Sequence, residues 1–390
     1  MGFQEGNPYI KLGNKYRCVF MSDNKRIVFI VNPISGVTGK RMVLRLIETK
    51  LDKEKYDYDI ISTKYQGHAI EIAREAADQG VDIVCAIGGD GTVNEVATAL
   101  IHTKTALAII PCGSGNGLAR HLHIPVDALG AIELINEGNI QPMDYGIVNG
   151  HPFFCTCGVG FDAFISMKFA QAGKRGPLTY IENVLKNGLT YNPETYDVEL
   201  IGVKYSSVDE VKPADGEKNV GDVEISHTYK AYLISAANAS QYGNNVYIAP
   251  QASVRDGLMD VTILEPFGVL EAPIVSFQLL NGTIDKNSLI KTFRCKKVVI
   301  HRSKSGPIHY DGDPIETGND VEAHIVPDGL LCVSPSSEGV KDMRENINGF
   351  FTEHFKDMYL RSENLIQENI QKTQRITQLN KEILQKLGGK

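Results

Sequence analysis

The stretch Val84-Cys85-Ala86-Ile87-Gly88-Gly89-Asp90-Gly91-Thr92-Val93-Asn94-Glu95 decides the fold of this chain. A short apolar run of strand length leads into three glycines and a carboxylate, and the apolar residues 96–101 that follow suit a helix. Glycines let the backbone approach a polyanion closely, and the N–H groups at a helix N-terminus favour negative charge. The stretch therefore predicts a strand, a tight turn and a helix that together bind phosphate.

Asp90 stands in the middle of this predicted phosphate turn. A carboxylate at such a position repels a phosphate ligand unless it holds a cation or exchanges a proton during a reaction. Asp90 is therefore the first candidate catalytic residue.

The composition is typical of a globular protein. The chain has 390 residues, of which 42% are hydrophobic and 22% are charged, a length that predicts two or three domains. A net charge of −7 gives no electrostatic reason to expect a nucleic acid as partner. No apolar run reaches the roughly 18 residues of a transmembrane helix. The seven cysteines lack metal-binding or redox spacing, so we expect reduced thiols and a cytoplasmic protein.

Strand and helix patterns alternate in the first part of the chain. Strands are predicted at residues 26–31, 56–62, 81–87 and 106–110, and helices at 40–51 and 67–80. The alternation predicts an α/β nucleotide-binding domain over residues 26–140, with a parallel sheet between helices, preceded by an irregular leader at residues 1–25. Ligands bind at the carboxyl ends of such strands, where the loops after Val31, Ser62 and Ile87 lie.

The pattern changes after residue 140. Strands are predicted at 143–149, 151–158, 196–203, 229–236, 259–264, 296–301 and 320–325, with a helical insert at 164–187. Residues 141–335 therefore form a predicted β-sandwich domain. Apolar residues at helical spacing return in residues 336–390 and predict a helical C-terminal extension. This extension packs on the body or forms a coiled coil in a homodimer, and its mixed charges favour a membrane-surface helix less.

Three loops, each at the end of a predicted strand, carry a family resemblance. They are Asn32-Pro33-Ile34-Ser35-Gly36, residues 88–95, and Gly113-Ser114-Gly115-Asn116-Gly117-Leu118-Ala119-Arg120. Four later motifs accompany them: Asp144-Tyr145-Gly146, Gly158-Val159-Gly160-Phe161-Asp162, Arg255-Asp256-Gly257-Leu258-Met259-Asp260 and Asp311-Gly312-Asp313. Together they resemble the diacylglycerol kinase and sphingosine kinase superfamily of lipid kinases over residues 26–335, and the third loop is more similar to that of sphingosine kinases.

The resemblance implies a lipid kinase that acts peripherally at a membrane surface. It would transfer the γ-phosphate of ATP, with Mg²⁺, to the hydroxyl of a diacylglycerol, a sphingoid base or a related lipid alcohol. Such a reaction needs positioning and charge neutralisation more than covalent catalysis. Lys174 and Arg175 are candidates for binding phosphate oxygens, although a solvated loop is an equal interpretation. The other residues that would bind the nucleotide are Asn32, Ser35, Gly36, Thr63, Gly88, Gly89, Gly91, Thr92, Glu95, Ser114 and Asn116.

The resemblance also assigns roles to carboxylates. Asp90 would be the general base or the organiser of Mg²⁺, with Asp144 as its partner in the metal network. Asp162 matches the position that contacts the lipid head group, where a carboxylate suits the cationic amine of a sphingoid base. Asp256 matches a structural metal site of bacterial members.

Two positions depart from the family pattern. Asp313 stands where members usually carry a glutamate that is a proposed general base, so either Asp313, with one methylene less reach, or Asp90 would be the base. Gly117 stands where bacterial diacylglycerol kinases carry an aspartate, which leaves a diacylglycerol substrate open.

Three other functions are weighed against the lipid kinase. An NAD kinase shares the Gly-Gly-Asp-Gly turn, but here Asn94 and Glu95 follow the turn directly instead of lying in a later segment. A non-catalytic ATP-binding protein would keep the loops and lack an acceptor. A dehydrogenase is disfavoured because the first strand lacks a Gly-x-Gly-x-x-Gly turn.

Overall fold

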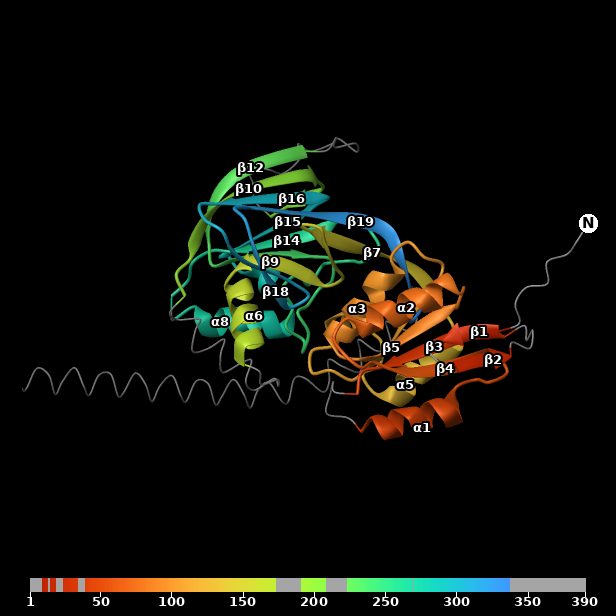
Figure 1. Cartoon of the computed structure of the whole chain (residues 1–390). Coiled ribbons are helices and arrows are strands. Elements are labelled where there is room, and N and C mark those ends of the chain that lie inside the picture. Colours follow the sequence, from red (N-terminus) through yellow and green to blue (C-terminus); the bar gives the residue numbers. More distant parts are fainter. Residues whose placement is uncertain are drawn as a thin grey trace, which may run out of the picture. The chain divides into compact units, whose positions relative to one another are not determined.

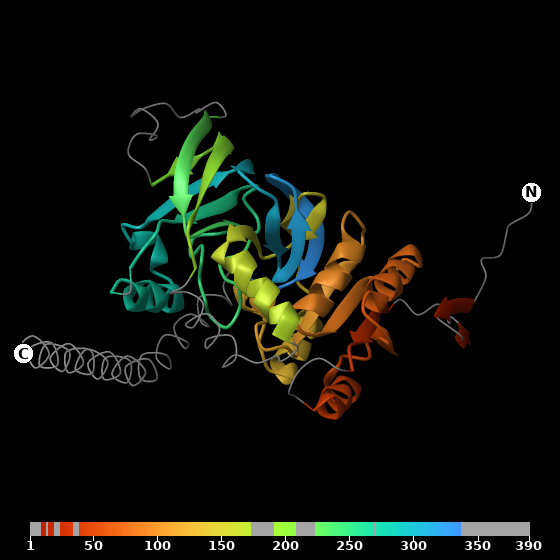
Figure 2. The same cartoon turned by 60° about the vertical axis from the view of Figure 1, so that its left-hand side comes forward.

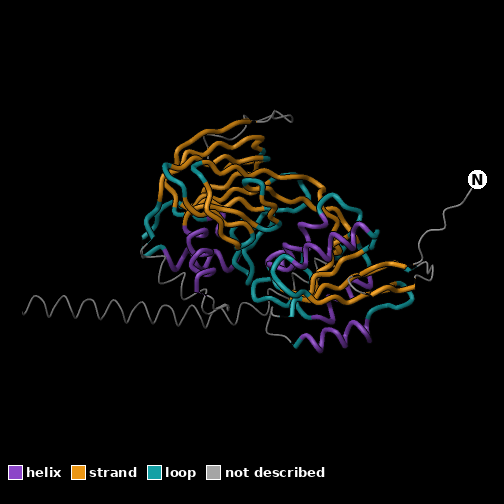
Figure 3. Tube along the Cα trace, viewed as in Figure 1, coloured by secondary structure: helices purple, strands orange, loops and turns teal. Residues whose placement is uncertain are grey.

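The computed structural model describes residues 9–12, 15–18, 24–33, 39–172, 191–207, 223–268 and 270–336. Figure 1 shows the elements in chain order, and Figure 3 distinguishes helices from strands. The predicted C-terminal helix falls almost wholly on residues 337–390, outside the described part, as does most of the helical insert. The predicted leader contains two short antiparallel strands, β1 (Tyr9–Leu12) and β2 (Lys15–Cys18).

The first part of the chain forms the predicted parallel sheet. Its strands lie in the order β4-β3-β5-β6, and every neighbouring pair is parallel. Helices α2 and α3 cover one face, and α1 and α5 cover the other (Figure 1). The strands are β3 (Lys25–Val31), β4 (Tyr56–Ser62), β5 (Ile83–Gly88) and β6 (Ala106–Pro111). The helices are α1 (Lys40–Lys50), α2 (His68–Asp78), α3 (Asp90–Leu100), α4 (Gly117–His121) and α5 (Ala128–Glu137).

The parallel sheet continues into the second half of the chain. Strand β19 (Asp320–Val333) returns to pair in parallel with β6, where Cys332 lies opposite Leu107. It also pairs antiparallel with β7 and β16, so the full sheet has ten strands in the order β12-β10-β16-β19-β6-β5-β3-β4, with β7 and β8 beside β19. The added strands are β7 (Ile140–Val148), β8 (His151–Phe153), β10 (Glu194–Val203), β12 (Val223–Ala231) and β16 (Lys297–Arg302).

A second, antiparallel sheet of seven strands faces this extension and completes the predicted sandwich. Val198 and Val298 of the first sheet share one buried core with Val261 and Phe293 of the second. Its strands, in spatial order, are β11 (Tyr205–Ser206), β15 (Ile290–Cys295), β14 (Met259–Leu264), β13 (Leu233–Ala237), β9 (Thr156–Gly160), β17 (Gly306–Tyr310) and β18 (Asp313–Thr317).

Two helices cover the outer face of the second sheet. Helix α6 (Phe161–Ala172) and helix α8 (Ala272–Asn281), with the short 3-10 turn η2 (Ile284–Lys286), pack on it through one apolar cluster. In Figure 2 the yellow-green α6 and the teal α8 lie on the same side of the β half. No helix among the described residues is long and apolar enough to cross a membrane.

Several predicted boundaries in the second half were wrong. The predicted strand 151–158 divides into β8 and β9, and 229–236 divides between β12 and β13, because the chain passes from one sheet to the other at each break. Helix α6 begins at Phe161, earlier than predicted. The prediction missed β15, β17, β18 and α8.

Gly146 on β7 allows Phe153 to pack over it, because a Cβ at Gly146 would lie 2.0 Å from Phe153 Cζ. We predict that Gly146→Ala destabilises the protein by about 1–3 kcal/mol, since overpacking displaces a fully buried ring. Thermal unfolding checks this against Gly318→Ala, where an added Cβ meets nothing within 4 Å. Equal melting temperatures for the two variants would contradict it.

Candidate active site

Two glycine turns meet at the carboxyl ends of β5 and β6. The parallel register places Gly88 opposite Pro111, so the turns that follow these strands start side by side. A Cβ at Gly113 would lie 2.6 Å from Gly89 Cα, and a Cβ at Gly89 would lie 3.1 Å from Gly113 Cα. Neither contact leaves room for a side chain. The second and third predicted loops therefore form one continuous backbone surface.

Asp90 ties these two turns together. It is the first residue of α3, and its Oδ1 accepts a hydrogen bond from the Gly117 N–H at 2.6 Å. Its Oδ2 accepts one from the Asn116 N–H at 2.9 Å, at the start of α4. Burial raises the pKa of Asp90, and these two N–H donors oppose the rise. Each carboxylate oxygen of Asp90, the predicted catalytic residue, therefore accepts a main-chain hydrogen bond.

Asp311 reaches α3 from the sandwich and was not among the predicted site residues. Its Oδ2 accepts hydrogen bonds from Asn94 Nδ2 and the Phe154 N–H, each at 2.9 Å, while its Oδ1 accepts from Cys155 and Thr156. Asp311 has a φ of +48°, as an aspartate before a glycine in a turn can adopt. Burial raises its pKa, and the hydrogen bonds oppose the rise. The Asp-Gly turn was the available signal.

The predicted base Asp313 lies across the same hairpin. It is the exposed first residue of β18, opposite Tyr310 of β17. Asp311, two residues earlier, accepts a hydrogen bond from Asn94, which follows the Gly-Gly-Asp-Gly turn.

Some of the predicted nucleotide residues lie together. Asn32 Nδ2 donates to Thr92 Oγ1 at 3.1 Å, and the absence of a side chain at Gly88 makes room for Thr92. Thr63 is buried directly after β4, and its N–H donates to the Val31 carbonyl. These residues place the ends of β3, β4 and β5 at one edge.

The other residues predicted to bind the nucleotide differ in their hydrogen bonds and exposure. Glu95 accepts hydrogen bonds from the N–H groups of Gly67 and Ala69, at the N-terminus of α2. Asn116 closes its own loop, accepting from the Gly113 N–H at 2.9 Å. Ser114 and Gly91 are exposed on the turns. The residues outside the described part are Ser35, Gly36, Lys174 and Arg175.

Asp162 belongs to a buried polar group that the sequence did not predict. Its Oδ2 accepts from His309 Nε2 at 3.1 Å and from the Tyr242 hydroxyl at 3.2 Å, and its Oδ1 accepts from the Ala163 N–H. His309 is 1% exposed, and its Nδ1 is buried with no hydrogen-bond partner in the described structure. Gly158 leaves the space for Asp162, since a Cβ there would lie 2.4 Å from Oδ2.

The segment after β13 connects this group to the glycine turns. The Asn244 N–H donates to the Gly115 carbonyl at 3.0 Å, and the glycine at 243 allows its backbone to pass directly over Gly115. Arg120 Nε donates to the same carbonyl at 3.1 Å. Tyr242, which contacts Asp162, is therefore part of the segment that closes over the third loop.

The two predicted metal ligands have other contacts. The Asp144 carboxylate is buried and accepts from the N–H groups of Gly257 and Asp328. Asp256 pairs with Arg294, which also contacts Asp260 at 3.4 Å. Within the described residues no group of three His, Cys, Asp or Glu side chains is arranged to hold a metal ion.

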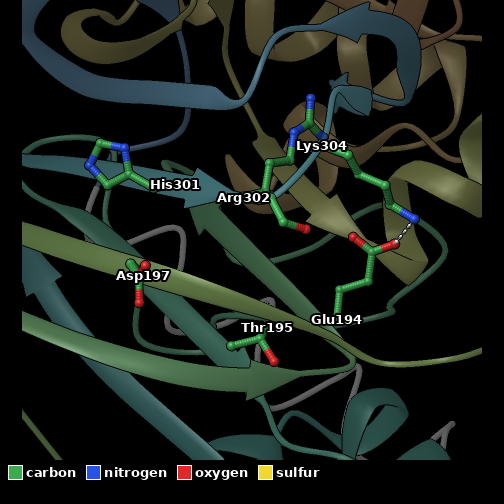
Figure 4. Close-up of a pocket in the computed structure, with 7 residues that line it drawn as sticks. Glu194, Thr195, Asp197, His301, Arg302 and Lys304 are labelled. Atoms are coloured by element: carbon green, nitrogen blue, oxygen red, sulfur yellow. Dashed lines mark ion pairs between the residues drawn. The ribbon is translucent and has the colours of Figure 1, made fainter.

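A pocket of about 500 Å³ lies elsewhere, on β10 and the end of β16 (Figure 4). Glu194 and Lys304 form an ion pair across it at 3.3 Å, and Arg302 donates to the carbonyls of the β17–β18 hairpin. None of its lining residues belongs to the glycine turns or to the Asp162 group. The lining residues are Glu194, Thr195, Asp197, His301, Arg302, Ser303 and Lys304.

Comparison with known proteins places this geometry in a family. A model of the diacylglycerol kinase catalytic domain matches residues 26–148, and one of the YegS C-terminal NAD kinase beta sandwich-like domain matches residues 155–333. A Pseudomonas aeruginosa protein (strain UCBPP-PA14) named "Probable lipid kinase YegS-like" is 30% identical, and the match covers 69% of this chain and 82% of the relative. The chain belongs to the diacylglycerol kinase and YegS-like family of lipid kinases.

A curated relative and a solved structure are similar to this chain over most of its length. The diacylglycerol kinase of Bacillus subtilis (strain 168) is 27% identical over 74% of this chain and 90% of its own length. The crystal structure of a diacylglycerol kinase from Bacillus anthracis superposes with a TM-score of 0.55 at 20% identity, covering 81% of this chain and 99% of that one. This likeness confirms the predicted two-part fold.

The contact between the turns gives a stability prediction. Gly113→Ala should lower the melting temperature, because its Cβ would meet Gly89 Cα, a backbone atom that cannot turn away. Gly91→Ala, at the start of α3, is the control, since an added Cβ there meets nothing within 4 Å. Thermal unfolding of both variants tests this. A Gly113→Ala protein as stable as Gly91→Ala would show that the turns are not in contact.

Asp260 gives a pH prediction. Burial raises its pKa from 3.8 to about 6, and Arg294 opposes the rise. Because the folded-state pKa is raised, the protonated carboxyl of Asp260 stabilises the folded protein, and this contribution is fully present below pH 3.8. The contribution, about 3 kcal/mol at most, is lost as the pH rises through 6. The stability of the wild type relative to Asp260→Asn should therefore fall between pH 4 and pH 7, measured by urea unfolding. A constant difference across this range would contradict the assignment.

Proposed function

We propose that this protein transfers the γ-phosphate of ATP to the hydroxyl of a lipid with the help of Mg²⁺, as a peripheral enzyme on the cytoplasmic side of a membrane. The observation that carries the proposal is that Asp90 joins the two glycine turns, while Asp311 of the sandwich half contacts Asn94 in the helix that follows the first of them. Membership of a lipid kinase family supports the choice of a lipid as acceptor. The acceptor is a diacylglycerol, a sphingoid base or a related lipid alcohol.

The glycine turns supply the phosphate-binding surface in this proposal. The exposed Gly91 and Ser114 follow the ends of two buried strands, where the backbone leaves room for phosphate oxygens. The N–H groups of Asn116 and Gly117 donate to Asp90 and are not part of this surface. Asn32, Thr63 and Thr92 add polar side chains at the same edge. Phosphoryl transfer depends mainly on such positioning and on charge neutralisation.

The carboxylates around the turns fit a magnesium ion. Mg²⁺ in kinases is commonly held by one or two carboxylates together with phosphate oxygens, and it neutralises the charge that develops on the transferred group. Asp90 is a carboxylate of this kind, and we assign the metal-binding role to it. Asp311 accepts four hydrogen bonds, two at each oxygen, so its contribution is the negative charge it adds near Asp90 and the buried Cys155. Asp313 or Asp90 takes the proton from the lipid hydroxyl, as the resemblance implies.

The Asp162 group is proposed to receive the lipid head group. A carboxylate only accepts hydrogen bonds, so the Nε2 atom of His309 carries the proton that it shares with Asp162. The buried Nδ1 atom of His309 then remains for a polar group of the substrate, because an unsatisfied buried nitrogen is costly. Asp162 would thus act on the head group through its contact with His309.

The direct test is phosphate transfer by the full chain. Incubation with radiolabelled ATP, Mg²⁺ and separate acceptors should label a lipid from a panel of diacylglycerol, sphingoid base and other lipid alcohols, and chelation of Mg²⁺ should abolish the transfer. Asp90→Asn and Asp311→Asn should each lower turnover by about 100-fold or more, because each removes a charge at the turns. Melting temperatures show whether these variants remain folded.

Two results would overturn the proposal. Labelling of NAD in place of every lipid would indicate an NAD kinase. ATP binding without transfer to any acceptor would indicate a non-catalytic nucleotide-binding protein.

A further inference from the structure

An exposed aromatic ring lies in the loop between β4 and α2. Tyr65 is 55% exposed, although its ring is stacked on His68, the first residue of α2. The two ring centroids are 4.6 Å apart, and the angle between the planes is 29°. Single apolar side chains are common on protein surfaces, so exposure alone assigns no role to Tyr65. Its surroundings and its place in the fold carry the argument.

The ring of Tyr65 is held in one position. Its hydroxyl donates a hydrogen bond to Glu71 Oε2 of α2 at 2.7 Å. The supporting ring of His68 is held as well, because the Lys64 N–H donates to His68 Nδ1 at 3.1 Å. A side chain that is already ordered loses little conformational entropy when a ligand binds. Tyr65 therefore offers a flat surface that is organised before binding.

The loop that carries Tyr65 is fixed to the edge where the phosphates are proposed to bind. Before Tyr65, the N–H of the buried Thr63 donates to the Val31 carbonyl at the end of β3, at 2.9 Å. After Tyr65, the Gly67 N–H donates to Glu95 Oε1 at 3.0 Å. Glu95 belongs to α3, the helix that starts in the second glycine loop. The aromatic ring is thus tied on both sides to the elements that form the site.

The order of the strands places the ring within reach of a bound nucleotide. The end of β4 is separated from the end of β5 by β3 alone, as Figure 1 shows. Neighbouring strands lie about 4.8 Å apart, so the two strand ends are roughly 10 Å from each other. A nucleoside triphosphate with its phosphates on the glycine turns can extend its base over this distance toward the loop after β4.

We infer that Tyr65 stacks on the adenine ring of ATP. The inference rests on the proposed function, in which ATP donates the phosphate, and it adds a residue for the part of ATP that the glycine turns do not contact. Aromatic side chains bind bases by stacking, because every base has a flat π-face. His68 and Glu71 are then positioning residues, since they act by holding the ring of Tyr65.

An acyl chain of the lipid fits this ring less well. The Glu71 carboxylate lies at the hydroxyl end of the ring, and an acyl chain that covered the ring would remove water from this charge. A base that stacks on the face of the ring leaves the carboxylate at its edge in water. The group proposed to receive the lipid also lies elsewhere, at Asp162 on α6.

The first experiment is a calorimetric titration of the full chain with AMP-PNP, an analogue of ATP that resists hydrolysis, in Mg²⁺ and without lipid. Tyr65→Ala should raise the Kd of the analogue about tenfold, because it removes the stacking surface. The Kd of inorganic tripolyphosphate, which has no base, should stay as in the wild type. Tyr65→Phe should bind the analogue within about threefold of the wild type, since the ring remains.

The matched control is Tyr205→Ala. Tyr205 is 52% exposed, similar to Tyr65, but it lies on β11 of the second sheet. This variant should bind both ligands as the wild type does. Melting temperatures show whether each variant remains folded.

The second experiment uses fluorescence. The chain contains no tryptophan, so Tyr65→Trp introduces a single fluorescent indole at the proposed stacking position. The analogue should quench this fluorescence, because the base would stack on the indole, whereas tripolyphosphate should not. In Tyr205→Trp neither ligand should change the fluorescence.

Three results would overturn the inference: an unchanged Kd of the analogue in Tyr65→Ala, an equal rise in the Kd of tripolyphosphate, or equal quenching of Tyr65→Trp by both ligands. Binding is measured without an acceptor, so it separates the two proposals. Base stacking in a protein that phosphorylates no lipid would keep this inference and remove the proposed function. Lipid phosphorylation by a Tyr65→Ala protein with unchanged nucleotide binding would do the reverse.

Discussion

The parallel pairing of β19 with β6 is the constraint on which the rest of the structure depends. It joins the α/β half and the sandwich by main-chain hydrogen bonds, so the two halves share one ten-stranded sheet. A flexible linker would leave the distance between Asp311 and the glycine turns variable. The second sheet packs on this shared sheet and carries the β17–β18 hairpin, whose Asp311 accepts a hydrogen bond from Asn94 of α3.

Three aspartates hold segments of this structure together through main-chain hydrogen bonds. Asp90, Asp144 and Asp311 each accept hydrogen bonds from at least two main-chain N–H groups and so join segments that are distant in the sequence. The same arrangement keeps negative charge beside the glycine turns, where a cation would be needed to bind a polyphosphate.

The parallel sheet could be predicted because each of its strands is a continuous apolar run that ends in glycine or a polar turn. The prediction for β4 has the same bounds as the strand in the structure. The sandwich was harder, since its strands are half-buried and its pairings join distant parts of the chain. Nothing in the residues around Cys332 indicates that they pair with Leu107.

The candidate site likewise combines residues that the sequence could predict with residues that it could not. Local patterns located the glycine turns and Asp90, because close backbone approach demands glycine. Asp311 depends on a left-handed turn that directs its carboxylate to Asn94, and His309 depends on the register of β17 against β9. Both are tertiary facts, so the Asp-Gly-Asp motif did not show that Asp311 contacts Asn94.

The return of β19 has a consequence for synthesis on the ribosome. Strand β6 is complete once Pro111 has emerged, but its outer neighbour ends at Val333, more than two hundred residues later. Throughout that interval the nascent sheet has an open edge, a common starting point for aggregation. The α/β half therefore cannot complete its sheet during synthesis until β19 has emerged.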